Sequence, residues 1–320
     1  VLNRIQKELK IFLFQNYVMN KLPIIYHPCY EFDSRRELRF PIQKYKNLKT
    51  HLEEINLLSE LNLFTPIALT KNQISISHDK QYVDRVFEGA LTHKEKRVIG
   101  LPFLDYFGKR AFVSSGGTLL AAKLALKFNI ALNLAGGSHH AGKNSGSGFC
   151  VFNDVAVACN CLLQEGLINR AVILDLDVHQ GDGTAEILST NDKVFTLSIH
   201  CEKNFPVRKK NSNLDIGLAA GTSDLDYLEA LDYALQRIVA FCPDIIFYNC
   251  GVDVHRDDNL GYLCLSTAGI ETRERKVLDF AQTNRVPVAV VLGGGYQKDI
   301  VKLVKLHSIV FREAAVRYDI

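Results

Sequence analysis

The stretch AVILDLDVHQGDG (residues 171–183) joins an apolar run to three aspartates and a histidine. Its first four residues are typical of a buried β-strand. Side chains two residues apart on an extended chain point the same way, so Asp175, Asp177 and His179 would share one face. Two carboxylates and an imidazole at that spacing are potential metal ligands. The stretch therefore predicts a buried strand that leads directly into a metal site.

The chain as a whole has the composition of a globular protein. Its 320 residues are 47% apolar and 23% charged. No linker or repeat divides them, which predicts a single domain over residues 1–320. The formal net charge of +3 is too small to indicate direct nucleic-acid binding. No window approaches the ~18 uninterrupted apolar residues of a membrane-spanning helix, so we expect no membrane span.

The cysteines and the N-terminal segment indicate the cellular compartment in which we expect the protein. None of the eight cysteines forms a C-x-x-C pair, and several lie within apolar patterns. We therefore expect a reducing, cytoplasmic location without a disulfide framework. Residues 1–23 include basic residues but only four consecutive apolar ones. This pattern favours an amphipathic docking helix over a signal peptide.

Apolar runs alternate with segments of helical periodicity along the chain. This alternation indicates an α/β fold with a central, mainly parallel sheet that helices cover on both faces. Ser223 and Asp226 resemble a capping box at the start of one helix. The expected strands are residues 129–136, 170–177, 193–200, 244–251 and 286–295, and the expected helices are residues 116–128, 153–166, 223–242 and 267–284.

Each of the five expected strands runs into a polar or glycine-rich motif at its carboxyl end. Parallel sheets bind ligands outside the carboxyl ends of their strands. Five segments that are distant in sequence are therefore expected to meet at one edge of the sheet. The motifs are GGSHHAG (136–142), DLDVHQGDG (175–183), SIH (198–200), NCGVD (249–253) and GGGY (293–296).

Three of the residues at this edge are candidate metal ligands. Asp177 and His179 supply two, and Asp253, which follows a neighbouring strand end, is the obvious third. Three protein ligands leave a coordination position open for water, as in catalytic zinc sites. Because the set is rich in oxygen, Fe²⁺ or Mn²⁺ is also compatible with it.

The remaining polar residues at the edge suggest acid–base chemistry. His139 and His140 are adjacent in a glycine-rich loop, where a histidine pair is suited to proton transfer. Such histidines need carboxylate partners, and Asp175 and Asp182 are the acids not used for the metal. Tyr296, after three glycines, could donate a hydrogen bond to an oxyanion. Together these residues predict metal-assisted hydrolysis of an amide.

The motifs resemble those of a known family. HHAGKNSGSGFCVFND (139–154), DLDVHQGDGT (175–184), GVD (251–253) and GGGY (293–296) resemble, in this order, zinc-dependent histone deacetylases, which have an arginase-like α/β fold. HQGDG (179–183), IGLP (99–102) and KNFPVRK (203–209) are most similar to the class IV branch and its bacterial relatives. The resemblance implies zinc-dependent hydrolysis of acyl-lysine in a protein or peptide substrate.

The same resemblance implies individual roles. His140 would be the principal general base and acid, with His139 as its electrostatic partner, and Tyr296 would polarise the acyl carbonyl. Zinc would be bound by Asp177, His179 and Asp253. A narrow tunnel for the acyl-lysine side chain would be lined by Gly148, Phe149 and Phe205. A structural K⁺ would be held by Asp175, Asp177, the main chain of His179, and Ser198.

Other functions are compatible with parts of this pattern. The same chemistry could serve an acetylpolyamine deacetylase or a deacylase for long fatty-acyl lysine, and no acidic gate is evident in the sequence to favour the polyamine. A di-manganese ureohydrolase would need a D-x-H-x-D motif, but Gln180 and Gly181 follow His179. An acyl-lysine binding module without catalysis is disfavoured because every chemical residue is present.

Overall fold

The computed structural model of the chain describes residues 21–31, 38–102 and 104–318. Its centre is an eight-stranded sheet of order β2-β1-β3-β8-β7-β4-β5-β6, in which every neighbouring pair is parallel. The strands are β1 (Ile24–Ile25), β2 (Leu63–Phe64), β3 (Ile130–Asn133), β4 (Ala171–Asp175), β5 (Val194–Cys201), β6 (Leu214–Leu218), β7 (Ile245–Asn249) and β8 (Val288–Val291). The predicted α/β class is confirmed.

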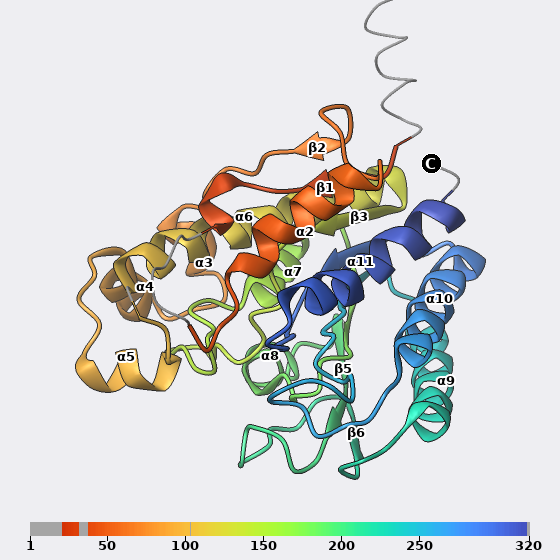
Figure 1. The fold of residues 1–320 in the computed structure, drawn as a ribbon. Coiled ribbons are helices and arrows are strands. Elements are labelled where there is room, and N and C mark those ends of the chain that lie inside the picture. The colour runs from red at the N-terminus through yellow and green to blue at the C-terminus, as the bar shows by residue number, and fades with distance from the viewer. Residues whose placement is uncertain (1–20, 32–37, 103, 319–320) are drawn as a thin grey trace, which may run out of the picture.

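Helices cover both faces of this sheet. Figure 1 shows α9 and α10 on one side of the strands and α4, α6 and α7 on the other. The helices are α2 (Gln43–Glu54), α3 (Lys71–Ile74), α4 (Lys80–Phe87), α5 (His93–Ile99), α6 (Leu104–Phe128), α7 (Asp154–Gln164), α8 (Asp182–Leu188), α9 (Asp224–Phe241), α10 (Thr267–Asn284) and α11 (Ile300–Arg317). The predicted N-terminal docking helix falls on residues 1–20, outside the described part of the chain.

The four predicted helices are all present, but one predicted cap is not. Ser223 is the N-cap of α9, yet its side chain accepts no hydrogen bond from the helix. The carboxylate of Asp224 instead accepts hydrogen bonds from the backbone N–H and the hydroxyl of Ser266, at 2.7 and 2.5 Å. The capping-box prediction was therefore wrong, because a tertiary contact to the start of α10 dominates at this end of α9.

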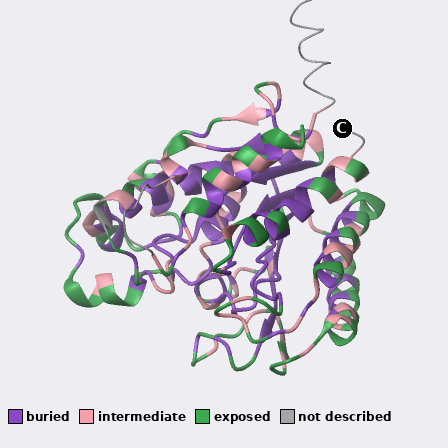
Figure 2. Ribbon diagram, in the orientation of Figure 1, coloured by how far each residue is buried: buried purple, intermediate pink, exposed green. Residues whose placement is uncertain are grey.

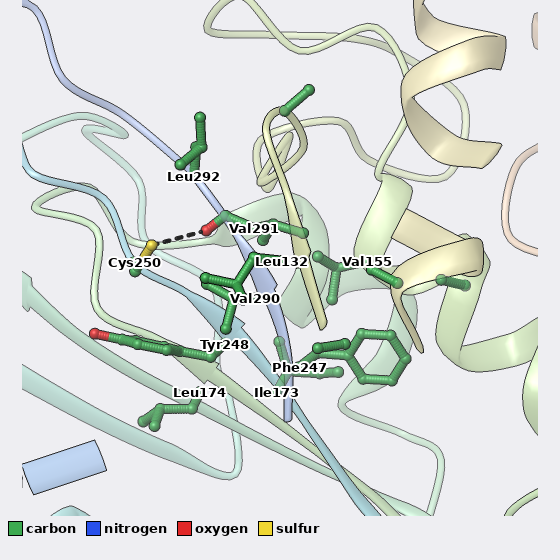
Figure 3. Packing of buried hydrophobic residues seen from close by; sticks show 14 of the residues in the cluster. Leu132, Val155, Ile173, Leu174, Phe247, Tyr248, Cys250, Val290, Val291 and Leu292 are labelled. Carbon is green, nitrogen blue, oxygen red and sulfur yellow. Dashed lines mark hydrogen bonds between the residues drawn. The ribbon is translucent and has the colours of Figure 1, made fainter. Parts of the chain in front are cut away.

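The core lies along the central strands and their covering helices. Every residue of β3, β4, β7 and β8 is buried. Figure 2 shows the centre of the sheet buried, while the outer faces of the helices are exposed. Side chains from these strands interdigitate with Val155 of α7 (Figure 3). Because both faces are covered, successive residues along a strand are apolar rather than alternating.

Two further predictions concern the chain as a whole. All eight cysteines are free thiols, as expected from their spacing. Within the part of the chain that the structure describes, no helix combines the length and apolar character needed to cross a membrane.

Candidate metal centre and active site

The residues singled out from sequence lie at the carboxyl edge of the sheet. β4, β7 and β8 are neighbours, and in register they end at Asp175, Asn249 and Val291. The loops after these residues carry the three candidate metal ligands and the candidate tyrosine. β3 pairs with β8 and leads into the loop with the histidine pair. The sheet topology therefore places all four segments together.

The loop after β4 bends sooner than the sequence suggested. The backbone N–H of Asp177 donates to Oδ1 of Asp175 at 3.2 Å, and that of His179 donates to Oδ1 of Asp177 at 3.0 Å. Carboxylates that accept from the backbone two residues on form Asx turns, which end a strand. The extended conformation expected for residues 176–179 was wrong, and the bend turns Asp175 toward His139 while Asp177 and His179 face Asp253.

Asp177, His179 and Asp253 form one buried group. One nitrogen or oxygen atom from each lies within 4.8 Å of the others. Nδ1 of His179 is 3.0 Å from Oδ1 of Asp177 and 3.1 Å from Oδ2 of Asp253. Other polar donors hold the carboxylates, since the N–H of Gly294 donates to Asp177 and that of Val178 to Asp253. The group can hold a metal ion.

The electrostatics of this group require positive charge. Burial would raise the pKa of Asp177, but His139 and His179 hold it well below its usual range. Burial and the nearby charge of Asp177 raise the pKa of Asp253 to about 7. Burial would lower the pKa of His179, yet hydrogen bonds to both carboxylates raise it to about 10. The group offers two oxygen ligands and one nitrogen ligand, and positive charge stabilises its two buried carboxylates. A divalent cation fits such a group.

Two glycines make room for the carboxylates. A Cβ atom at Gly294 would lie 2.0 Å from Oδ2 of Asp253, and one at Gly251 would lie 2.5 Å from Oδ2 of Asp177. Real Cβ atoms do not approach that closely, so any side chain there would displace a candidate ligand. The glycine motifs noted in the sequence thus have a steric role beside the metal group.

Each histidine of the pair has its own aspartate. Nδ1–H of His139 donates to Asp175 at 2.7 Å, and Nδ1–H of His140 donates to Asp182 at 2.6 Å. Burial would lower the pKa of His139, but Asp175 and Asp177 raise it to about 9. Burial and the charge of His139 lower the pKa of His140 to about 4, against the effect of Asp182. At neutral pH, His139 is cationic and His140 is a neutral base.

Asn249 belongs to the candidate site, but the sequence analysis quoted it only within the motif NCGVD (249–253) and gave it no role. Its Nδ2–H donates to Oδ1 of Asp175 at 2.9 Å, which orients the carboxylate that holds His139. A polar residue at the end of an apolar strand was the available signal. Ser198 is the register partner of Asp175 on β5 and is buried, with its hydroxyl 3.0 Å from Nδ1 of His200. The K⁺ site at these residues stays a prediction.

Tyr296 stands beside the metal group. Its ring centroid is 6.2 Å from that of His179. Burial and the charges of Asp177 and Asp253 raise the pKa of Tyr296 well above its usual value, so the phenol keeps its proton and can donate a hydrogen bond. Its backbone N–H donates to Oδ2 of Asp258 at 2.7 Å. Asp258, another residue missed from sequence, therefore anchors the tyrosine.

Lys44 contacts the glycine segment 293–295 that precedes Tyr296. It is fully buried, donates to the carbonyl of Gly293 at 2.9 Å, and lies 5.9 Å from the ring centroid of Tyr296. Such cation–π contacts help to compensate a buried charge. Its spacing of four from Leu48, on the apolar face of α2, was a signal that could have marked Lys44 as buried.

A cavity of about 470 Å³, here called the active-site pocket, opens above the metal group. The ring of Phe205 lies 4.8 Å from that of His140, and the ring of Phe149 lies 5.9 Å from that of Tyr296. Gly148 has φ +52°, and a Cβ there would be 2.6 Å from Cδ2 of His140. The three predicted tunnel residues therefore line one cavity together with His140, His179 and Tyr296.

Fold and site define a hydrolase built on a parallel α/β sheet. Residues 39–309 match the histone deacetylase domain, and the chain belongs to that family. It is 43% identical over 293 residues to an uncharacterized protein of Picosynechococcus sp., covering 91% of this chain and 98% of that one. The family resemblance predicted from the motifs is thus confirmed.

Solved structures share the fold. A histone deacetylase homolog from Aquifex aeolicus superimposes with a TM-score of 0.77 at 24% identity, covering 93% of this chain and 84% of that one. An acetylpolyamine aminohydrolase from Burkholderia pseudomallei superimposes with a TM-score of 0.74 at 21% identity, covering 92% and 99%. At these identities the likeness concerns the fold alone.

Proposed function

We propose that this histone deacetylase family member hydrolyses the amide of acyl-lysine in proteins or peptides. One observation carries the proposal: His140, Tyr296 and His179, the histidine of the metal group, line the active-site pocket together with the aromatic rings of Phe149 and Phe205. A lysine side chain is long and its methylenes are apolar, so a pocket with aromatic walls and a polar floor suits it.

Four polar side chains of the site each have one role in the proposed reaction. His140, neutral at pH 7, accepts the proton of the attacking water and later donates it to the leaving amine. His139, held cationic by Asp175, stays protonated and stabilises negative charge. The hydroxyl of Tyr296 donates to the carbonyl oxygen as charge develops there. Asp182 fixes the ring of His140 in the orientation that this transfer needs.

A metal ion completes the proposed site. Asp177, His179 and Asp253 would hold it, and we propose Zn²⁺, with Fe²⁺ as the other candidate, because the three ligands leave coordination positions open. When bound, the ion supplies Lewis-acid chemistry. We further propose a structural K⁺ at Asp175, Asp177, the main chain of His179, and Ser198.

The test is a hydrolysis assay with peptides that differ only in the acyl group on one lysine. Acetyl and long fatty-acyl peptides are compared with acetylpolyamines, because the motifs similar to class IV make a long acyl chain a candidate. We expect hydrolysis of acyl-lysine peptides by protein containing one divalent metal per chain, and inhibition by hydroxamates. Hydrolysis of acetylpolyamines alone would overturn the proposal.

The matched control is Asp177→Ala, which removes a charged candidate ligand. We expect this variant to lose both the metal and the activity. Full retention of metal, or two catalytic metal ions per chain in the unmodified protein, would contradict the assigned site.

A further inference from the structure

The mouth of the active-site pocket carries only positive formal charge. Sixteen residues line the pocket, and Arg39, Arg97 and Lys203 are among them, while no aspartate or glutamate is. The three side chains are exposed and come from separate parts of the chain: the segment before α2, helix α5, and the loop after β5. A substrate entering the pocket would meet cations from three directions.

A second hollow continues from this mouth and extends the same charge. Its volume is about 390 Å³, and it shares Arg39, Asn259, Leu260 and Tyr296 with the active-site pocket. Lys298 is added to its lining, again without any carboxylate. We call the two hollows together the basic groove. Room exists there for polypeptide on one side of the lysine that enters the pocket.

The cations of the basic groove have no counterions within the described residues. Arg39, Arg97, Lys203 and Lys298 make no ion pair there, whereas exposed cations elsewhere often do, as Lys276 does with Asp232 at 2.7 Å. Among the described residues, three carboxylates adjoin residues of the groove in the chain: Glu202 and Asp299 are exposed but line neither hollow, and the third is Asp258. Its two oxygens accept hydrogen bonds from the backbone N–H groups of residues 260, 261 and 296, so it is turned inward.

Unpaired charges of one sign at a pocket mouth select ligands of the opposite sign. Charges within a Debye length, about 10 Å at 0.1 M salt, attract or repel an incoming substrate. Such fields change association rates by about 10-fold to 10³-fold. A basic peptide or a polyamine would bring cations toward four cations, while a segment rich in aspartate and glutamate would bring the counterions that are missing.

We propose that the basic groove selects acyl-lysine within acidic polypeptide segments, an inference that rests on the hydrolysis proposed above. The acylated side chain enters the active-site pocket, and flanking carboxylates pair with Arg39, Arg97, Lys203 and Lys298. The preferred substrate class is thus a protein with aspartate or glutamate near the acylated lysine, and basic segments are disfavoured.

The test uses three labelled peptides with the same central acetyl-lysine and flanks of glutamate, glutamine or lysine. We expect kcat/KM to be at least about tenfold higher with glutamate than with lysine at low ionic strength. The difference should lie mainly in KM and shrink as salt is added. Equal kcat/KM values, or a preference for lysine flanks, would overturn the inference while the proposed hydrolysis stands.

Two charge-reversal variants test whether the basic groove causes the preference among the three peptides. Arg97→Glu should narrow or invert the ranking of the three peptides. The control Lys193→Glu changes an exposed lysine that makes no ion pair with any residue the structure describes. Lys193 directly precedes β5, at the opposite end of the strands, so this variant should leave the ranking unchanged. An unchanged ranking in Arg97→Glu, or the same change in both variants, would refute a role for the groove.

A binding measurement separates the two proposals. Fluorescence anisotropy with the Tyr296→Phe variant reports the affinity for each peptide without rapid turnover. Tighter binding of the glutamate peptide without hydrolysis by the unmodified protein would support the groove and overturn the proposed function. Absence of both binding and hydrolysis would overturn both.

Discussion

His139 and His140 are adjacent in sequence but differ in their electrostatic surroundings. His139 faces two buried carboxylates, with Nδ1 at 2.7 Å from Asp175 and Nε2 at 3.8 Å from Asp177. His140 has a single partner, Asp182, and its ring is only 4.1 Å from that of cationic His139. The pKa values therefore move apart, to about 9 and about 4. Such separation is how two similar groups acquire different roles.

The hydroxyl of Tyr296 carries the first prediction. Tyr296→Phe keeps the ring and its packing but removes the donor to the developing oxyanion. Loss of one such donor typically costs about 10²–10³ in kcat. We expect kcat to fall at least about a hundredfold, while metal content, melting temperature and hydroxamate binding stay unchanged. A near-normal kcat with a lower melting temperature would make the tyrosine purely structural.

Sequence predicted the residues with distinctive chemistry and missed those that support them. Asp177, His179 and Asp253 were recognisable because carboxylates and imidazoles rarely follow apolar strands without a reason. Lys44 and Asn249 act through tertiary hydrogen bonds to Gly293 and Asp175. Which carbonyl or carboxylate a buried polar side chain will reach depends on strand order and register, and these are not readable from one chain.

Among the elements, the long apolar strands were predictable and the edge strands were not. β3, β4, β7 and β8 consist of near-continuous apolar runs, and β5 alternates apolar residues with Thr196, Ser198 and His200. β1 and β2 have two residues each, too few to show any period. β6, residues 214–218 at the edge of the sheet, alternates intermediate and exposed residues, so it lacks the apolar run of a central strand. Helix α6 begins at Leu104, before the predicted residue 116, and Phe107, Ala111 and Phe112 in its first half are buried in the core.

His78 links the loop at Gly142 to the start of α7, and it carries the second prediction. Its Nδ1–H donates to the carbonyl of Gly142, and its Nε2 accepts from the N–H of Asn153 at the start of α7. Burial lowers the pKa of His78 to about 4, below the unfolded value of about 6.5. The unfolded chain therefore binds a proton first, and stability is lost as pH falls from about 6.5 toward 4, by up to roughly 3 kcal/mol.

The measurement is the melting temperature between pH 7.5 and pH 5 for the unmodified chain and for His78→Gln. Glutamine can donate to Gly142 and accept from Asn153 but does not titrate. We expect the variant to lose less stability across this range, with a shallower slope. Identical slopes would show that other buried histidines, such as His200, account for the acid sensitivity.

At the scale of the whole molecule, metal binding and folding should be coupled. The metal group gathers residues from the loops after β4 and β7, so it exists only in the folded chain. A ligand that binds only the folded state stabilises it by about 2.7 kcal/mol at a hundred times its Kd. We expect a chelator to lower the melting temperature by at least about 3 °C and added Zn²⁺ to restore it.

The control for this third prediction is Asp177→Ala. Without one candidate ligand, its melting temperature should not respond to chelator or Zn²⁺. An equal response in both proteins would mean that the ion acts elsewhere on the chain.

The glycines around the metal group determine how the chain tolerates mutation. Gly251 and Gly294 lie against the carboxylates of Asp177 and Asp253, where even a methyl group would collide. We expect Gly294→Ala to lose metal binding as completely as Asp177→Ala, although no ligand atom is removed. In a library of all single substitutions, the least tolerant positions would thus include residues without any chemistry of their own. Heritable loss of activity in this protein would arise as readily from a gained methyl group as from a lost ligand.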